Sequence, residues 1–245
     1  MLATSTPSVA HRLRPAKVRS AVRRRWFEFE VPRVDLSGAP GIVDLGSPYG
    51  AWRIPGGLIG ASWLCYCVGA GGDVSFDLEL IHRYHATVRA FDAVGEFVGE
   101  ALREAAGEPG FSAHHAALTT CDGPIRMQRS HDARSRSVSS AALYDSDEFI
   151  ELPGRTLQSL MDELGDDHID LLKLDVEGSE YELLPALDLR ALGVKILAAQ
   201  LHHTTSVARA RALIAELRQS GYEPVACLAP VRLAFARRDL LEPRR

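Results

Sequence analysis

The chain has 245 residues, and its 28 lysines and arginines against 32 aspartates and glutamates leave a formal net charge of -4. A hydrophobic share of 46% and a charged share of 24% are ordinary globular values and exclude a wholly disordered chain. No apolar run approaches the roughly 18 residues that span a bilayer, and the N-terminus lacks the apolar stretch of a secretory signal. We therefore expect one large domain in a cytoplasmic protein, with its four cysteines as buried thiols.

The charge is unevenly distributed along the chain. Residues 1–25 contain seven basic side chains and no acid, which leaves 21 bases against 32 acids in residues 26–245. A basic arm suits nucleic acid or anionic lipid, but a body this acidic is a poor match for a phosphate backbone. Nucleic acid is therefore not expected as the main substrate. We expect residues 1–40 to be a leader, partly disordered or packed on the core, ahead of a single domain over residues 41–245.

From residue 62 onward, apolar strands alternate with helical patterns, which predicts an α/β fold with a mostly parallel sheet and helices on both faces. Strands are predicted at 62–68, 87–91, 111–118, 125–128, 169–176 and 195–201, and helices at 75–84, 96–106, 156–164, 179–187 and 206–220. Residues 129–149 are polar and predict a surface loop, of a length that often covers a site. Two final β runs, 223–228 and 232–236, predict a closing antiparallel hairpin.

A glycine-rich turn follows the first predicted strand. Gly69, Gly71 and Gly72 stand between that strand and a helix, where missing side chains allow a sharp turn and close approach to a ligand. Asp92 ends the next strand, 21 residues after Gly71, and a carboxylate at this spacing can accept the hydroxyls of an adenosine ribose. The pattern predicts an adenosine-containing cofactor. The alternative is a plain tight turn with a solvated aspartate.

Acidic and histidine side chains follow the two strands over 169–176 and 195–201. Asp175 and Glu177 stand at the end of one, and His202 and His203 at the end of the other. Ligands of open α/β sheets bind outside the carboxyl ends of their strands. Two acids there can orient a hydroxyl or bind a divalent cation, and a neutral imidazole can take a proton or ligate a metal. Helix capping by Glu177 is the structural alternative.

Several segments together resemble the FkbM-type family of S-adenosylmethionine-dependent methyltransferases. They are GSPYGAWRIP (46–55), CYCVGAGGDVSFDLEL (65–80), VRAFDAV (88–94), CDG (121–123), TLQSLMDELG (156–165), IDLLKLDVEGSEYELL (169–184) and QLHH (200–203). The resemblance covers about residues 42–236, and the 169–184 segment is its most specific part. It implies a Rossmann-like class I methyltransferase fold of seven strands, the last one antiparallel, and O-methylation of small molecules or glycans.

The resemblance also implies roles for individual residues. Gly69, Gly71 and Asp73 would lie beside the methionine end of the cofactor, Asp92 would hold the ribose, Ala117 and Asp122 would flank the adenine, and Asp175 and Glu177 would face the methyl group and the acceptor. One position departs from the pattern. Many class I methyltransferases carry an acid two residues before the first glycine, where this chain has Cys67, and Asp73 is the candidate substitute toward the cofactor's amino group.

These patterns predict an O-methyltransferase that acts on a sugar or oligosaccharide, with a polyketide or other secondary metabolite as the alternative acceptor. Asp175, Glu177 and one of His202 and His203 are the candidates for removing the acceptor's proton, and Asp175, Glu177 and His202 are candidate Mg²⁺ ligands. A nucleotide-dependent oxidoreductase is a competing reading, although the GxGxxG spacing is missing. A non-catalytic binding module is another. Residues 1–60 offer a surface for a homodimer.

Overall fold

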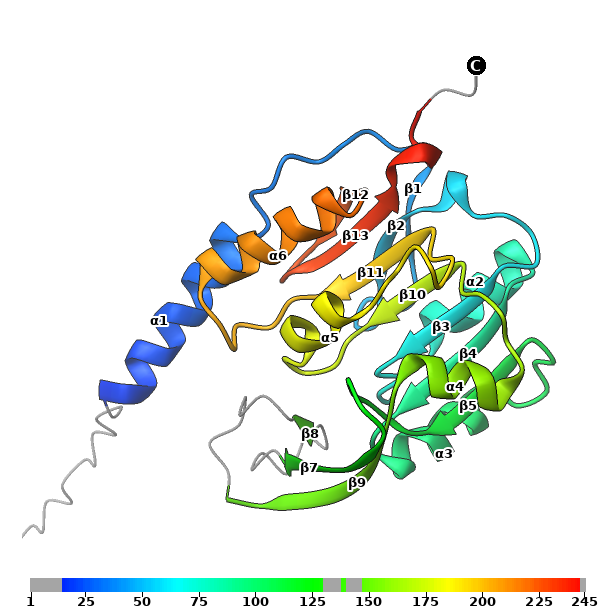
Figure 1. Ribbon diagram of the computed structural model, residues 1–245, viewed down its shortest axis with the longest axis horizontal. Coiled ribbons are helices and arrows are strands. Elements are labelled where there is room, and N and C mark those ends of the chain that lie inside the picture. Colours follow the sequence, from blue (N-terminus) through cyan, green and yellow to red (C-terminus); the bar gives the residue numbers. More distant parts are fainter. Residues whose placement is uncertain (1–14, 130–137, 140–146, 243–245) are drawn as a thin grey trace, which may run out of the picture.

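A seven-stranded sheet forms the centre of the computed structural model, which describes residues 15–129, 138–139 and 147–242. In spatial order its strands are β12 (Tyr222–Leu228), β13 (Arg232–Arg237), β11 (Ile196–Gln200), β10 (Leu171–Leu174), β3 (Leu64–Val68), β4 (Thr87–Asp92) and β5 (Phe111–His115) (Figure 1). The pairs from β11 to β5 are parallel, whereas β13 runs antiparallel to both β11 and β12. The predicted mostly parallel sheet with a closing antiparallel hairpin is confirmed.

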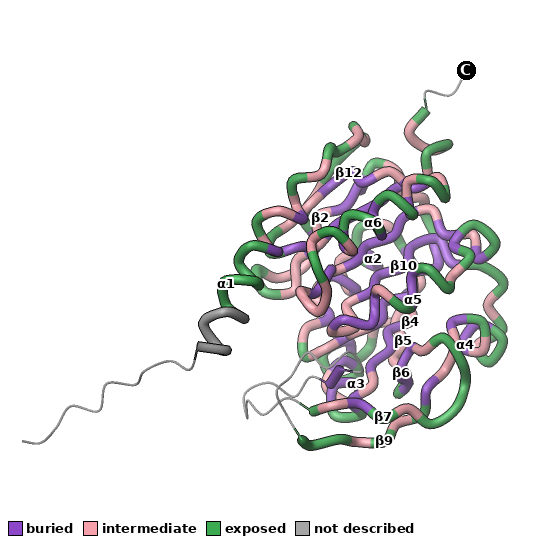
Figure 2. Tube along the Cα trace, turned by 60° about the vertical axis from the view of Figure 1, so that its left-hand side comes forward, coloured by how far each residue is buried: buried purple, intermediate pink, exposed green. Residues whose placement is uncertain are grey.

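Helices cover both faces of this sheet, as predicted. One face packs against α2 (Ser75–Tyr84), α3 (Gly95–Glu104) and the hairpin of β1 (Ile42–Leu45) and β2 (Trp52–Pro55). The other face packs against α4 (Leu157–Leu164), α5 (Glu180–Ala186), α6 (Val207–Gln219) and the end of α1 (Pro15–Glu30). Two 3₁₀ turns, Gly56–Leu58 and Arg238–Leu240, complete the described elements. Figure 2 shows the buried residues concentrated in the central strands.

The central strands read as continuous apolar runs because both of their faces are covered. All residues of β3 and β10 are buried, and Lys173 is the one charged side chain in these two strands. Helix α4 begins and ends at the residues that its signals indicate. Thr156 accepts a hydrogen bond from the Ser159 amide at the start of α4, and Gly165 adopts the left-handed conformation at its end.

A second, four-stranded sheet lies beside the main one. It contains β6 (Ala117–Leu118), β9 (Phe149–Arg155), β7 (Gly123–Arg129) and β8 (Val138–Ser139) in that order. The prediction of one strand over 111–118 is wrong in this respect, because the chain leaves β4 after His115 and pairs with β9 from Ala117. The predicted surface loop over 129–149 lies mostly outside the described residues. Its residues 138–139 form β8 instead, and β9 was not expected.

The N-terminal segment packs on the domain through the end of α1. Phe27 is 1% exposed and Val31 is fully buried in the core. Glu30 forms an ion pair of 2.7 Å with Arg211 of α6, and the Ser37 amide donates to the Pro224 carbonyl at 2.8 Å. The described part of the predicted leader, residues 15–40, therefore includes a helix with docking contacts.

Two composition-based expectations have an outcome in the structure. Cys65 and Cys67 are buried, as expected, whereas Cys121 is exposed and Cys227 is half-buried, so the expectation of four buried thiols is wrong for these two. Across the described ranges, no helix combines the length and the apolar character needed to cross a membrane.

Candidate active site

A cavity of about 380 Å³ lies at the carboxyl ends of β3, β4 and β10. The turn after β3, the start of the chain after β4 and the loop after β10 form its walls, and Met127 and Val138 of the second sheet close one side. Tyr49, Gly50 and Trp52 border it from the β1–β2 segment. Its size falls within the range of small-molecule sites, which is about 300 to 1,000 Å³.

The glycine turn fits tightly against the loop after β10. Gly69 has φ +83°, and a Cβ at this residue would lie 2.0 Å from the Asp175 carbonyl oxygen. Gly71 also has a positive φ of +59°, and its amide donates to Asp92 Oδ2 at 2.8 Å. These positions require glycine because a side chain would clash or strain the backbone.

Asp92 lines the cavity at the end of β4 and is 6% exposed. Its second oxygen, Oδ1, accepts a hydrogen bond from the Val94 amide at 2.8 Å. Burial raises the pKa of this carboxyl, against the opposing effect of the Gly71 and Val94 amides. The two amides fix the carboxylate in place at the rim where the sequence predicts ribose binding, which stays a prediction.

Asp73 also lines the cavity, but both oxygens of its carboxylate already accept hydrogen bonds from the protein. Oδ2 accepts from the Ser47 hydroxyl, and Oδ1 accepts from both the amide and the hydroxyl of Ser75. Burial opposes the charged form, yet these donors outweigh it and lower the pKa of the carboxyl. A Cβ on Gly50 would lie 2.8 Å from this carboxylate. Asp73 therefore holds the 46–50 segment against the start of α2.

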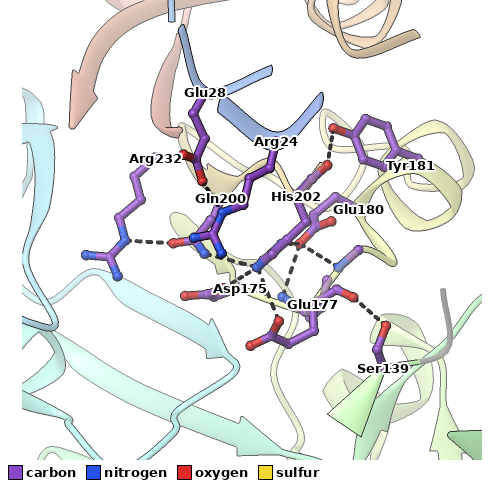
Figure 3. Close-up of polar contacts among 12 residues, drawn as sticks. Arg24, Glu28, Ser139, Asp175, Glu177, Glu180, Tyr181, Gln200, His202 and Arg232 are labelled. Carbon is purple, nitrogen blue, oxygen red and sulfur yellow. Dashed lines mark hydrogen bonds and ion pairs between the residues drawn. The ribbon is translucent and has the colours of Figure 1, made fainter. Parts of the chain in front are cut away.

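Carboxylates from three positions converge on the His202 side chain, next to the loop after β10 (Figure 3). The His202 Nδ1 atom lies 2.8 Å from Glu180 Oε1, and Nε2 lies 3.4 Å from Glu177 Oε2 and 3.7 Å from Asp175 Oδ1. Glu180 is fully buried and also accepts from the Val176 and Gly178 amides. The arrangement joins the ends of β10 and β11 through one imidazole.

The His202 ring is held in its protonated form. Burial alone would lower its pKa, but the charges of Glu180, Asp175 and Glu177 outweigh burial and raise the pKa to about 9. Gln200 Nε2 lies 3.0 Å from His202 Nε2 and would donate to a neutral ring. The three neighbouring carboxylates favour the charged ring, whose Nε2 proton faces Glu177 and Asp175.

The loop that carries Asp175 and Glu177 has an unusual backbone. Glu177 has φ +51°, a conformation that costs free energy in a residue other than glycine. The Ser139 hydroxyl of β8 donates to the Glu177 carbonyl oxygen (Figure 3). The strained loop is thus tied to the second sheet, at the edge of the cavity. Strain of this kind is typical of functional loops.

The remaining predicted site residues lie in different places. Ala117 is buried and lines the cavity. Asp122 does not line it, because its carboxylate accepts from the Thr156 amide and the Ser159 hydroxyl at the start of α4. This geometry does not favour a contact with adenine. His203 is also not among the lining residues, and burial together with the charge of Arg24 lowers its pKa.

The described residues do not support the Mg²⁺ expectation. Nowhere in these ranges do three His, Cys, Asp or Glu side chains form a group that could hold a metal ion. Of the expected ligands, Asp175 and Glu177 each form an ion pair with the third, His202, instead. A protonated imidazole has no lone pair to offer a cation, which gives the physical reason.

Comparisons with known proteins identify the family. Residues 70–224 match the family model described as the methyltransferase FkbM domain. The chain belongs to the FkbM methyltransferase family. No curated protein sequence matches the chain.

Solved structures with some similarity are also methyltransferases. One is TrmK of M. capricolum in complex with S-adenosylhomocysteine, with 11% identity, a TM-score of 0.42, and coverage of 74% of this chain but only 65% of that one, less than two thirds of its length. The METTL16 methyltransferase domain has 10% identity, a TM-score of 0.41 and coverage of 91% and 68%. An S-adenosylmethionine-dependent methyltransferase from Aquifex aeolicus has 12% identity, a TM-score of 0.36 and coverage of 72% and 82%.

The FkbM domain implies S-adenosylmethionine as the methyl donor, and the charges of the cavity suit this molecule. Five acids line the cavity against the two permanent cations Lys173 and Arg232; the acids are Asp73, Asp77, Asp92, Asp175 and Glu177. A surplus of negative charge complements a ligand that carries sulfonium and ammonium cations.

The sequence did not single out three residues that shape this FkbM site. Glu180 is the buried partner of His202, Asp77 is a buried acid on the cavity wall, and Arg232 donates to the Gln200 side chain at 2.8 Å. Glu180 and Asp77 stand in helical segments where an acid normally faces solvent. The sequence contained a signal for both acids. Each is next to, or one helical turn from, apolar residues that are buried in the same helix, and this spacing places the acid on the inward-facing side.

Proposed function

We propose that this protein is an S-adenosylmethionine-dependent O-methyltransferase whose acceptor is a hydroxyl of a sugar or oligosaccharide. The observation that supports it most is the position of Asp175. It lines the same cavity as the glycine turn and Asp92, and it lies at the edge shared with Glu177 and His202. A cofactor held at β3 and β4 would have its reactive end near these acids.

Bound S-adenosylmethionine would supply an electrophilic methyl group, so the protein must position the acceptor and remove its proton. We assign the proton to the Asp175 carboxylate, which is partly exposed, at 22% of its side chain. A sugar hydroxyl is too weak an acid to ionise first, and the proton therefore moves as the carbon–oxygen bond forms. The acceptor oxygen would gain the methyl group as the methyl–sulfur bond breaks, S-adenosylhomocysteine would leave, and Asp175 would gain the proton.

His202 acts as a positioning cation in this scheme and not as the base. With a pKa near 9 it already carries its second proton at neutral pH. Its positive charge lies between the Asp175 and Glu177 carboxylates and offsets their mutual repulsion, and the ion pair with Glu180 holds the ring in position. The proton chemistry therefore needs no metal at these three residues.

The cavity wall near Asp175 supports a polyhydroxylated acceptor. Lys173 and Arg232 lie 5.6 and 5.4 Å from the centre of the Trp52 ring, and both line the cavity. Tyr49 borders the opening and is 81% exposed. An aromatic ring beside charged donors and acceptors suits a sugar, which presents an apolar face and several hydroxyls.

The experiment is transfer of a labelled methyl group from S-adenosylmethionine to a panel of sugars and hydroxylated secondary metabolites. We expect label in a sugar ether, at least 100-fold less with Asp175→Asn, and the same rate in EDTA. Glu182→Gln, an exposed change on α5, is the matched control and should behave as the wild type. Unchanged transfer by Asp175→Asn would reject the assignment of the base, and transfer only to non-sugar acceptors would reject the acceptor class.

A further inference from the structure

One carboxylate on the cavity wall has no hydrogen-bond partner. Asp77 lies in the first turn of α2 and is 1% exposed, and both of its oxygens are unpartnered among the described residues. It is nonetheless one of the residues that line the cavity. A buried carboxylate without donors is unfavourable because it has lost its hydration, and an acid of this kind is more easily explained by a ligand that supplies the donors.

The neighbours of Asp77, Cys67 and Lys173, stabilise its charged form only in part. Cys67 and Lys173 are register partners on β3 and β10, so both side chains lie on the sheet face that α2 covers. Cys67 is fully buried and its thiol stays neutral, so it is only a weak donor beside Asp77. Burial raises the pKa of the Asp77 carboxyl, and the charge of Lys173 and the Cys67 thiol only partly oppose this effect. Lys173 Nζ donates to the Gly69 carbonyl oxygen at 2.8 Å, and its charge acts on Asp77 without a hydrogen bond to either carboxylate oxygen in the described part of the chain.

Asp77 differs in this respect from the two other acids near the glycine turn. Both oxygens of Asp73 accept from serines, and both oxygens of Asp92 accept from backbone amides. Asp77 is therefore the acid at this end of the cavity whose two oxygens, both buried, accept no hydrogen bond from the described residues. Its partner must carry positive charge and several N–H donors. An ammonium group satisfies both conditions, whereas a sulfonium has no N–H donor and a ribose has no charge.

We propose that Asp77 binds the ammonium group of the methionyl part of S-adenosylmethionine. The inference rests on the assignment of this cavity to the cofactor. In this chain the carboxylate comes from α2, next to Cys67, and Asp73 has the separate task of holding the 46–50 segment. Asp77 would then discriminate the whole cofactor from nucleosides that lack the amino acid part.

Calorimetric titration with two probes tests this assignment. S-adenosylhomocysteine carries the ammonium group, and 5′-methylthioadenosine has the same nucleoside and thioether without it. Asp77→Asn should weaken S-adenosylhomocysteine about 10- to 100-fold, the ordinary range for a hydrogen-bonded charge, and change methylthioadenosine less than about 2-fold. Asp73→Asn is the matched comparison. It should weaken the binding of both probes to a similar extent, because it removes contacts that hold the 46–50 segment beside the cavity.

The variant's stability separates a binding role from a structural one. Because burial disfavours the charged form of Asp77, a neutral amide in its place should leave Asp77→Asn at least as resistant to urea as the wild type. Equal loss of both probes, or no loss of either, would overturn the proposal. If the variant does not fold, a des-amino analogue of S-adenosylhomocysteine on the wild type makes the same comparison, and equal affinity for it would overturn the proposal. A wild type that binds neither probe would instead contradict the assignment of the cavity, and this proposal with it.

Discussion

The pair of Glu180 and His202 makes a quantitative prediction about stability. Glu180→Gln keeps the shape of the side chain but removes the charge that contributes most to holding the His202 ring protonated. A pKa of about 9 against an ordinary 6.5 corresponds to about 3 kcal/mol of preference for the charged ring. We therefore expect the variant to lose up to about 3 kcal/mol of unfolding free energy at pH 6.

The pH dependence of this loss is the sharper test. A histidine whose pKa is raised on folding contributes its full stability below the unfolded pKa, near 6.5, and loses it as the pH rises through about 9. The deficit of Glu180→Gln should therefore be largest at pH 6 and disappear above pH 9.

Urea denaturation at pH 6, 7.5 and 9.5 measures this difference. Glu182→Gln, on the exposed side of the same helix, should stay within about 0.5 kcal/mol of the wild type at each pH. A deficit of Glu180→Gln that is constant over the whole range would refute the reasoning, because it would show that the His202 proton is not involved.

Three other predictions concern the cofactor end and the N-terminal helix. Asp92→Asn should weaken S-adenosylhomocysteine about 10-fold or more in calorimetry, because the carboxylate loses its charge toward the ribose hydroxyls; unchanged affinity would contradict its predicted role. Gly69→Ala should abolish this binding and lower the melting temperature, since the new Cβ would meet the Asp175 carbonyl at 2.0 Å; a variant that binds normally would show that the turn relaxes freely. Phe27→Ala should cost about 3 to 5 kcal/mol in urea denaturation, whereas Phe29→Ala, 53% exposed, should cost less than about 1 kcal/mol; equal effects would mean that α1 does not dock.

The helices and strands that were predicted correctly have a strong local pattern of apolar residues in the sequence. The helix expected over 75–84 is present as Ser75–Tyr84, and the strands expected at the glycine turn and at Asp175 are β3 and β10. Asp92 and Asp175 were identified because each ends a strand, and the carboxyl ends of parallel strands meet at one edge of the sheet. These positions follow from the chain order alone.

The features that the sequence did not predict depend on distant contacts. β9 contains Pro153 and Gly154, which read as a turn, and it exists because it pairs with β7 and β6. Glu180 was not predicted as a site residue because its partner His202 is 22 residues away. Asp73 and Asp77 are both acids near the same turn, and their burial and their hydrogen bonds distinguish them. The sequence pattern predicts which edge of the sheet carries the site. Tertiary packing determines which acids at that edge already accept hydrogen bonds from the protein.

Binding of S-adenosylhomocysteine to the wild-type protein tests the central claim most directly. Calorimetry or thermal unfolding with this product and, in parallel, with NAD would distinguish methyl transfer from the nucleotide-dependent alternative. We predict one site per chain for S-adenosylhomocysteine, with a clear rise in melting temperature, and no effect of NAD. Stabilisation by NAD without any by S-adenosylhomocysteine would contradict the account.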